Sequence, residues 1–386
     1  MPRALAGLAV VMVLAACGST SPVSGDVASS ARESPSPPES PSPPASRSQA
    51  TGSNGSVYGV LVDLHAADPQ SYQVSVVSLQ GQVAASFSAA RRTLPQSGQG
   101  QPLELPYVSS SLTGLYFLDG DSILRKLLLD SMAVFGEPVM SVGGSAGVEA
   151  AFAVSPDDRR IAVSLLDFTR SPVHVTLYTD DLGGGDRHVI YESDTDYVWP
   201  VAWHSGLLVL AHGYGPHLED ALKVAPGQDN PYWAISYHVV DPANANRKAL
   251  VGQACTVSGP LSPAGSACIQ GGTVDWSGAN TNWSTYDWGS ISAAASLSPD
   301  GSFVTAAQPD DDKKLAFYRP GGAIATWVDG PGSQVWAGWL DNLHILIPSG
   351  GNVNEARIVA LTPGPSPAIF VYAGGFYAAR LPTDIV

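Results

Sequence analysis

Short apolar runs separated by turn residues make up most of this chain. Residues 58–64 (YGVLVDL), 72–79 (YQVSVVSL) and 83–87 (VAASF) are three such runs, and they are rich in the β-branched and aromatic residues that favour strands. No long segment shows the 3.6-residue periodicity of an amphipathic helix. The pattern predicts three strands of one small sheet and an all-β fold for the region that begins at Val57.

A tight turn recurs between pairs of these runs. Residues 297–304 (LSPDGSFV) and 153–163 (AVSPDDRRIAV) are close copies, and residues 261–269 (LSPAGSACI) are a weaker one. Proline sets φ for the second turn position, aspartate can accept hydrogen bonds from nearby amides, and glycine tolerates a positive φ. The repeat therefore predicts a series of hairpins.

The spacing of the hairpins predicts an array of small sheets. The turn positions Ser111, Ser155, His204, Ser262, Ser298 and Leu340 recur every 36 to 58 residues. Repeats of about four strands at this period are typical of the blades of a β-propeller. We predict seven blades, with six or eight as alternatives; a two-sheet sandwich would hold too few strands for so many turns.

The two ends of the folded region are predicted to meet. The first sheet lacks a fourth strand, and the run at residues 376–380 (FYAAR) follows the last sheet with no partner of its own. Pairing the two would hide two exposed strand edges. We therefore expect the C-terminal strand to complete the first blade.

The Ser-Pro-Asp-Gly hairpins resemble those of bacterial TolB-type propellers, which share their fold with WD-repeat proteins. The similarity extends over residues 57–386 and is specific at the turns of Ser155 and Ser298. It implies a closed ring of blades and protein partners in the cell envelope. No individual binding residue is matched.

The N-terminus has the features of an export signal. Arg3 precedes an apolar run over residues 4–13, which is shorter than the about 20 residues that a membrane-spanning helix needs. The run ends in Leu14-Ala15-Ala16-Cys17, which resembles the lipobox of bacterial lipoproteins. The resemblance implies a signal peptide over residues 1–16 and acyl chains, palmitate among them, on Cys17. A plain secretory signal with a chance cysteine is the alternative.

Residues 17–56 have a different composition. They include SPSPPESPSPP at residues 34–44 and contain no aromatic residue, so they have little apolar surface to bury. We predict a disordered Pro/Ser-rich linker between the lipidated cysteine and the propeller at residues 57–386. The expected location is extracytoplasmic, on the cell membrane.

Charge and cysteine content narrow the choice of partners. The net charge of −15, with 19 Lys and Arg residues, argues against a nucleic-acid surface, which needs clustered basic residues. We expect a monomer. Cys255 and Cys268 flank the turn at Ser262 and are predicted to form a disulfide in an exported protein, two buried thiols being the alternative.

Several motifs with possible catalytic or metal-binding roles are better explained structurally. The GGSAG string at residues 143–147 leaves no room for the helix of a nucleophile elbow, so we interpret it as a connection between blades. His212, His217, Glu219 and Asp220 lie in one loop without a known metal-site spacing, and residues 310–312 (DDD) are typical of a solvated hairpin tip. We predict no catalytic set, metal site or cofactor.

An aromatic stretch is the candidate binding site. Trp276, Trp283, Tyr286 and Trp288 lie among Asn, Ser, Thr and Asp residues, a combination that suits glycans or peptide side chains. The alternative is that the tryptophans pack between blades.

Three functions are consistent with these observations. We expect a lipid-anchored propeller that acts as a binding or assembly scaffold for an envelope protein or glycan. A lyase or hydrolase acting on an envelope substrate is an alternative, which His204, His212, His217 or His238 meeting a carboxylate near the ring axis would favour. A sensor domain for a membrane partner is the third.

Overall fold

The computed structural model describes residues 56–64, 68–93, 105–130, 136–213, 234, 236–252, 260–268, 272–282, 295–308, 311–319, 324–329, 337–348, 355–361 and 368–383. These residues form strands and turns without a helix, so the described part of the chain has no helix that could cross a membrane. Cys17, the signal region 1–16 and residues 17–55 of the linker lie outside it. The prediction of an all-β fold is confirmed.

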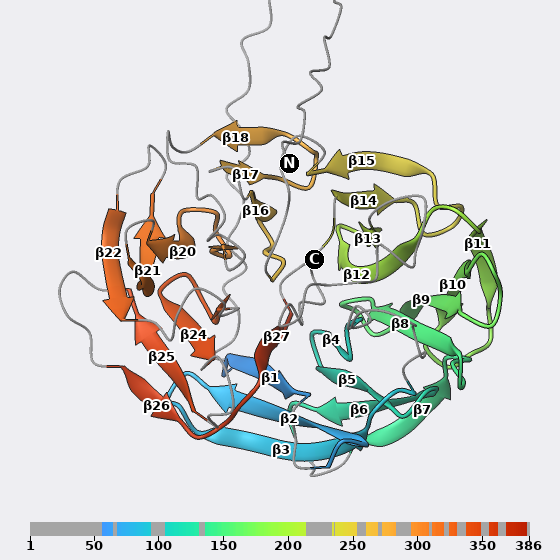
Figure 1. Cartoon of the computed structure of the whole chain (residues 1–386), viewed down its shortest axis with the longest axis horizontal. Helices are drawn as coiled ribbons and strands as arrows, with labels where there is room; N and C mark the ends of the chain where they lie inside the picture. The colour runs from blue at the N-terminus through green and yellow to red at the C-terminus, as the bar shows by residue number, and fades with distance from the viewer. Residues whose placement is uncertain are drawn as a thin grey trace, which may run out of the picture. The chain divides into compact units, whose positions relative to one another are not determined.

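Seven antiparallel sheets follow one another around a ring, which is the arrangement of a β-propeller (Figure 1). We number these blades 1 to 7 in chain order. From the innermost strand outwards, blade 1 contains β27 (Phe376–Leu381), β1 (Tyr58–Asp63), β2 (Ser71–Ser78) and β3 (Val83–Ala90). Blade 2 contains β4 (Val108–Ser110), β5 (Gly114–Asp119), β6 (Ile123–Leu128) and β7 (Glu137–Ser141).

Blades 3 and 4 have the same four-stranded order. Blade 3 contains β8 (Val148–Val154), β9 (Arg160–Asp167), β10 (His174–Asp181) and β11 (His188–Ser193). Blade 4 contains β12 (Val198–His204), β13 (Leu207–His212), β14 (Ser236–Val240) and β15 (Arg247–Val251).

Blade 5 is the exception, with three strands in the described residues: β16 (Ser266–Cys268), β17 (Gly272–Val274) and β18 (Asn280–Asn282). Blade 6 contains β19 (Ser296–Leu297), β20 (Val304–Gln308), β21 (Asp311–Tyr318) and β22 (Ile324–Asp329). Blade 7 contains β23 (Gly338–Trp339), β24 (His344–Pro348), β25 (Ala356–Ala360) and β26 (Ile369–Val371).

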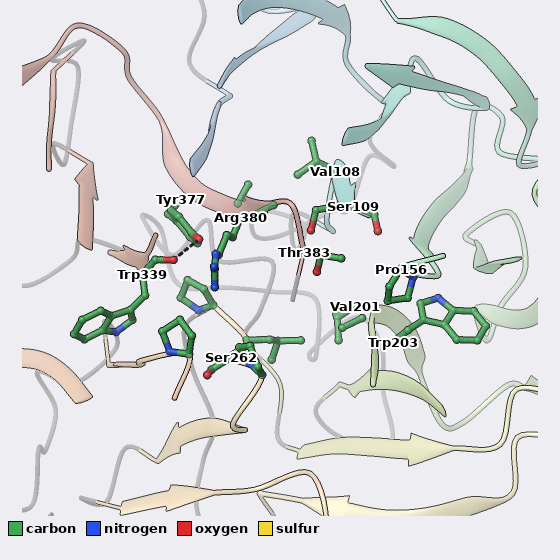
Figure 2. A pocket seen from close by; sticks show the side chains of 18 of the residues that line it. Val108, Ser109, Pro156, Val201, Trp203, Ser262, Trp339, Tyr377, Arg380 and Thr383 are labelled. Atoms are coloured by element: carbon green, nitrogen blue, oxygen red, sulfur yellow. Dashed lines mark hydrogen bonds between the residues drawn. The ribbon is translucent and has the colours of Figure 1, made fainter. Parts of the chain in front are cut away.

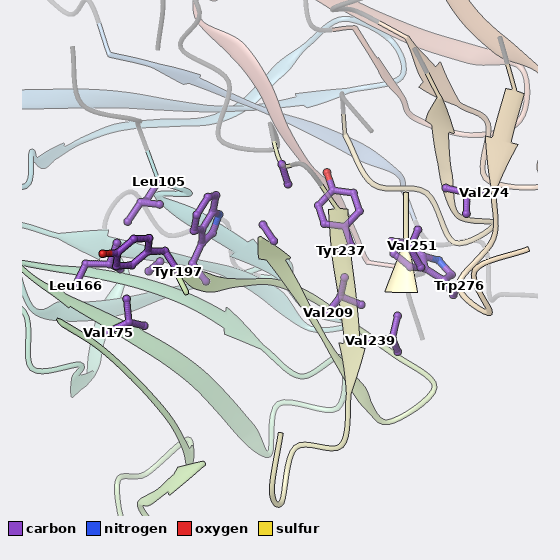
Figure 3. Packing of buried hydrophobic residues seen from close by; sticks show 14 of the residues in the cluster. Leu105, Leu166, Val175, Tyr197, Val209, Tyr237, Val239, Val251, Val274 and Trp276 are labelled. Carbon is purple, nitrogen blue, oxygen red and sulfur yellow. The ribbon is translucent and has the colours of Figure 1, made fainter. Parts of the chain in front are cut away.

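The position of a strand in its blade explains its residue pattern. The outermost strand β3 alternates between exposed and buried residues, with Ala85, Phe87 and Ala89 turned inward. The inner strand β8 is buried almost throughout, because both faces of a blade pack against neighbouring blades. One large cluster of buried residues accordingly draws mainly on blades 3, 4 and 5, including Val175, Tyr237 and Val274 (Figure 3).

The C-terminal strand closes the ring, as the sequence predicts. β27 pairs antiparallel with β1, Gly59 opposite Arg380 and Val62 opposite Phe376, and the red and blue strands lie side by side in Figure 1. Closure is tight. A Cβ at Gly338 in blade 7 would lie 2.1 Å from ring atoms of Tyr377, so glycine at this position lets blade 7 approach β27.

The Gly-rich string at residues 143–147 connects blades 2 and 3. Ser145 exchanges backbone hydrogen bonds of 3.0 and 2.9 Å with Val148, and β8 begins at Val148 with no intervening helix. Gly143 and Gly147 both have a positive φ. The interpretation as a connection, not a nucleophile elbow, is confirmed.

Candidate functional site: the central pocket

One face of the ring is built from repeated short turns, and we call it the turn face. It is the side on which the innermost strands β4, β8, β12, β19 and β23 end. Their turns begin at Ser111, Ser155, His204, Ser298 and Leu340. In blade 5 the matching turn lies at Ser262, whose backbone exchanges hydrogen bonds of 3.0 Å with Gly265.

The turns at Ser155 and Ser298 share one hydrogen-bond pattern. Each serine hydroxyl donates to the aspartate two residues on, at 2.7 Å in the first turn and 2.8 Å in the second, and accepts the amide five residues on. Burial alone would raise the pKa of Asp300, but the hydrogen bonds from Ser302 and Ser298 outweigh it and lower that pKa. The carboxylate therefore stabilises the turn in its charged form.

The two turns differ in the residue that adopts the left-handed backbone conformation. Gly301 takes it in blade 6 with φ 73°, whereas Asp158 takes it in blade 3 with φ 59°. The unusual backbone directs the carboxylate of Asp158 towards blade 2, where it accepts hydrogen bonds of 2.7 Å from both Thr113 and Tyr116. Lys126 adds an ion pair at 3.2 Å.

These contacts shift the acidities of the groups involved. Burial alone would raise the pKa of Asp158, but the bonds from Tyr116 and Thr113 and the charge of Lys126 outweigh it and lower the pKa. Burial and the bond to the carboxylate raise the pKa of Tyr116. The pair thus joins blades 2 and 3 with Asp158 charged and Tyr116 protonated.

Tryptophans fasten the innermost strands to one another. The indole of Trp203 in β12 donates to the carbonyl of Ala153 at 3.0 Å, and that of Trp339 in β23 donates to Ser296 at 3.1 Å. Tyr377 of β27 continues the series by donating to the carbonyl of Trp339 at 3.0 Å. These hydrogen bonds join blade 4 to blade 3, blade 7 to blade 6 and blade 1 to blade 7.

A pocket opens between these innermost strands (Figure 2). All seven blades contribute to its lining, mostly with valine, alanine, proline, serine and tryptophan residues such as Val108, Pro156, Trp203 and Pro263. The cavity has a volume of about 70 Å³. Since one water needs roughly 10–15 Å³, it has room for a few waters or the end of a side chain.

Arg380 is the one charged side chain among the described residues that line the pocket. Figure 2 shows it extending from β27 into the space enclosed by the innermost strands. Two of the lining hydroxyls are engaged within the fold, because Ser109 accepts the amide of Val154 at 2.9 Å and Ser262 donates to the carbonyl of Ser298 at 2.8 Å. The pocket thus combines apolar side chains and hydroxyl groups with one cationic group among the described residues.

Sequence reasoning did not single out Arg380. The residue belongs to the predicted closing strand, but no local motif surrounds it. Its position opposite Gly59 in a central strand is a consequence of ring closure. The available signal was a lone arginine at the end of the strand predicted to close the ring.

The predicted histidines do not meet a carboxylate in the pocket. His212 does pair with Asp196, and its ring stacks on His238 at 4.8 Å between centroids, but none of the three lines the cavity. They lie at the seam between blades 3 and 4, where β12 begins and β13 ends. His217 lies outside the described residues, and the ring of His204 lies tilted against Trp276, with 5.7 Å between the ring centroids.

Burial is the main influence on His238. Together with the nearby His212 and Arg247, it lowers the pKa of His238 to about 4. Tyr191 donates to the other oxygen of Asp196 at 3.0 Å. The result is a network in which His238 is neutral at pH 7.

The aromatic stretch is divided by the structure. Trp276 is only 6 % exposed, donates its indole N–H to the carbonyl of Ser262 at 3.0 Å, and packs near Tyr237 in the cluster of Figure 3. For Trp276 the alternative of packing between blades is therefore correct, because its ring fills the seam of blades 4 and 5. Trp283, Tyr286 and Trp288 lie outside the described residues.

The cysteine pairing stays a prediction. Cys268 is buried in β16, and Cys255 lies outside the described residues. The same holds for Glu219, Asp220 and Asp310. Among the residues the structure does describe, no group of three His, Cys, Asp or Glu side chains is arranged to hold a metal ion.

Fold and site together define a seven-bladed β-propeller with an apolar central pocket that carries one arginine. No protein-family model matches the chain. No curated protein matches it either.

Several solved propellers are similar in fold. An oligogalacturonate lyase solved with manganese is 12 % identical, with a TM-score of 0.47, over 76 % of this chain and 83 % of that one. Sqt1 of Saccharomyces cerevisiae is 11 % identical, with a TM-score of 0.43, over 83 % and 87 %. A TolB protein of Agrobacterium tumefaciens is 12 % identical, with a TM-score of 0.34, over 70 % and 82 %. Similarity at this level concerns the fold and assigns no activity.

Proposed function

We propose that this protein is a membrane-anchored extracytoplasmic lipoprotein whose propeller acts as a binding scaffold for an envelope partner. The turn face is the proposed docking surface. The single observation that carries this proposal is the pocket on the ring axis, to which every blade contributes. The described lining contains no pair of titratable side chains suited to acid–base catalysis.

The turn face also presents apolar side chains to solvent. Leu112 in the blade 2 turn is 47 % exposed and Leu343 in the blade 7 turn is 54 % exposed. Large apolar side chains exposed on a surface are a feature of many protein-binding sites. Hydrogen bonds accepted by the side chains of Ser111 and Asp341 hold the backbone of these two turns, so a partner would meet a surface that is already formed.

The anchor is proposed from the sequence. Acylation of Cys17 would attach the protein stably when two or more chains are present. A Cys17→Ala variant tests it: the protein is expected to move from the membrane fraction to the soluble fraction in the source cell. Retention in the membrane fraction would contradict the lipid anchor and leave the docking proposal to its own test.

Site-specific photocrosslinking in the source cell tests the docking surface. A crosslinker at Leu112 or at Leu343 is expected to capture the same envelope protein or glycan. The matched control is Val189, which is 55 % exposed on the outer strand β11. Equal capture from Val189, or different partners from the two turn-face positions, would contradict a partner bound on this face.

The enzyme alternative has one observation in its favour. The contact between His212 and Asp196 is a carboxylate–imidazole pair of the kind used in general base catalysis. It lies outside the pocket. Turnover of an envelope glycan that is lost in His212→Gln and unchanged in Arg380→Gln would select this alternative over the scaffold.

A further inference from the structure

We propose that the central pocket receives the side-chain carboxylate of an aspartate or glutamate from a partner polypeptide, with Arg380 as the binding residue. This inference rests on the proposed scaffold function and names the chemistry of the partner. The molecule carries a net charge of −15, yet the one charged group among the described pocket-lining residues is positive. Charge complementarity in the pocket thus selects an anionic group against the overall charge of the protein.

The surroundings of Arg380 strengthen such a contact. Val108, Val154, Val201 and Leu297 line the pocket together with four prolines. Apolar walls lower the local dielectric constant and make an ion pair stronger than it would be in water. An incoming carboxylate in these surroundings is favoured only where it pairs with the guanidinium.

Guanidinium geometry matches a carboxylate. An arginine presents five N–H donors in a planar fork and can bind both oxygens of one carboxylate at once. The same number of donors allows Arg380 to keep hydrogen bonds within the fold while it binds a ligand. The backbone of Arg380 is held in place by its pairing with Gly59. Three residues further along the chain, the backbone N–H of Thr383 donates a hydrogen bond of 3.0 Å to the carbonyl of Ser111.

Cavity size favours a polypeptide over an acidic glycan. About 70 Å³ accommodates a carboxylate on a short methylene stem, whereas a chain of sugar rings needs a wider space. The four prolines of the pocket lining suit the apolar neighbours of such a residue on an extended segment. The partner is therefore expected to present an acidic residue flanked by apolar ones.

A displayed library of random dodecapeptides is the probe for this inference. Selection on the wild-type propeller is expected to enrich peptides that share an Asp or Glu beside apolar residues. Replacing that acid by its amide in a synthetic peptide should weaken binding about tenfold or more, because one partner of a desolvated charge pair is removed. The peptide-side change needs no variant of the protein, so folding of the propeller is not at issue.

Variants of the protein complete the test. Arg380→Gln should weaken binding of the acidic peptide about tenfold or more, and Arg380→Lys should retain part of the affinity. The amide peptide should bind Arg380→Gln as it binds the wild type, because the charge pair is already removed. The matched control is Arg170→Gln, an exposed arginine outside the pocket, which should bind the peptide as the wild type does. Melting temperatures establish that each variant is folded.

Three results would overturn the inference. Peptides that bind wild type and Arg380→Gln equally would leave a scaffold whose pocket does not recognise carboxylates. A glucuronic acid oligosaccharide that binds through Arg380, while no acidic peptide is enriched, would replace the polypeptide by a glycan. Failure to enrich any peptide would also reject it, and the photocrosslinking result then decides separately whether the turn face binds a partner.

Discussion

The two faces of the ring use different chemistry. On the turn face, short hairpins hold carboxylates such as Asp158 and Asp300 in their charged form through several hydrogen bonds. On the opposite face, at the seam of blades 3 and 4, His238 is half-buried and neutral beside the pair of His212 and Asp196. One fold therefore combines a face that acid weakens only below about pH 3.8 with one that milder acid weakens.

Physical linkage gives the two faces different pH windows. Lowering the pKa of Asp158 below its usual 3.8 gives stability that is present above that value and is lost as pH falls further. Lowering the pKa of His238 from 6.5 to about 4 means that the unfolded state binds more protons between these values, so stability falls as pH drops through that window. Mild acid should affect the seam before the turns.

The largest effect is expected from removing the closing strand on which both faces depend. Deletion of residues 376–386 takes away β27 and leaves the edge of β1 open. Buried Tyr377, Ala378 and Leu381 are lost with it, so we expect loss of the cooperative melting transition measured by circular dichroism. Deletion of residues 384–386 alone keeps β27 and is the control; a wild-type transition in the larger deletion would contradict closure by this strand.

A second prediction tests packing at the point of closure. Gly338→Ala places a methyl group against the ring of Tyr377 and should lower the free energy of unfolding by about 1–3 kcal/mol, as overpacking does. The matched control is Gly183→Ala, where a Cβ would meet nothing within 4 Å, and should change little. Chemical denaturation measures both, and equal effects would show that closure is not tightly packed.

Asp158→Asn tests the turn face. Asparagine tolerates the left-handed backbone, so the change removes the charge and weakens the bonds from Tyr116, Thr113 and Lys126. We expect the free energy of unfolding to fall by about 1–2 kcal/mol at pH 7. This difference from the wild type should shrink when pH falls below 3.8. The exposed Asp181→Asn on β10 is the control for denaturation measurements, and a loss independent of pH would contradict the charged contact.

His238→Gln tests the opposite face and has the smallest expected effect. Between pH 7 and pH 5 the free energy of unfolding of the wild type should fall by about 1 kcal/mol through the titration of His238. This value takes into account that the side chain is partly exposed. The variant should lack that part of the pH dependence, because it cannot take up a proton in the unfolded state. The control variant His188→Gln, at an exposed position on β11, should keep the pH dependence of the wild type. Urea titrations at pH 7 and pH 5 measure the free energy of unfolding of each variant. A pH dependence in His238→Gln equal to that of the wild type would remove the contrast between the faces.

Local sequence patterns predicted much of the fold. The turn at Ser298 carries its own proline, aspartate and glycine, and its geometry depends on residues within five positions. The strands of blade 1 were likewise predictable, because residues 58–87 contain three short runs rich in β-branched and aromatic residues. Closure of the ring by the C-terminal strand was also predictable, because an unpaired strand at each end left one consistent way to hide both edges, whereas the number of blades was left open between six and eight.

The candidate site was much less predictable. Trp276 stood out in the sequence but fills the seam between blades 4 and 5, since burial depends on the neighbouring blade. Arg380 did not stand out, yet it lies in the central pocket. The contact of Asp158 with Tyr116 joins residues 42 positions apart, and no local motif encodes it.

By itself the sequence determined the hairpins, the all-β class and the order of the blades, because these depend on interactions between residues close together along the chain. The tertiary structure alone decided which side chains face the ring axis, which face a neighbouring blade, and which carboxylates meet a tyrosine or a histidine. Those outcomes depend on how seven sheets pack around a closed ring, and the position of Arg380 in the central pocket results from that packing.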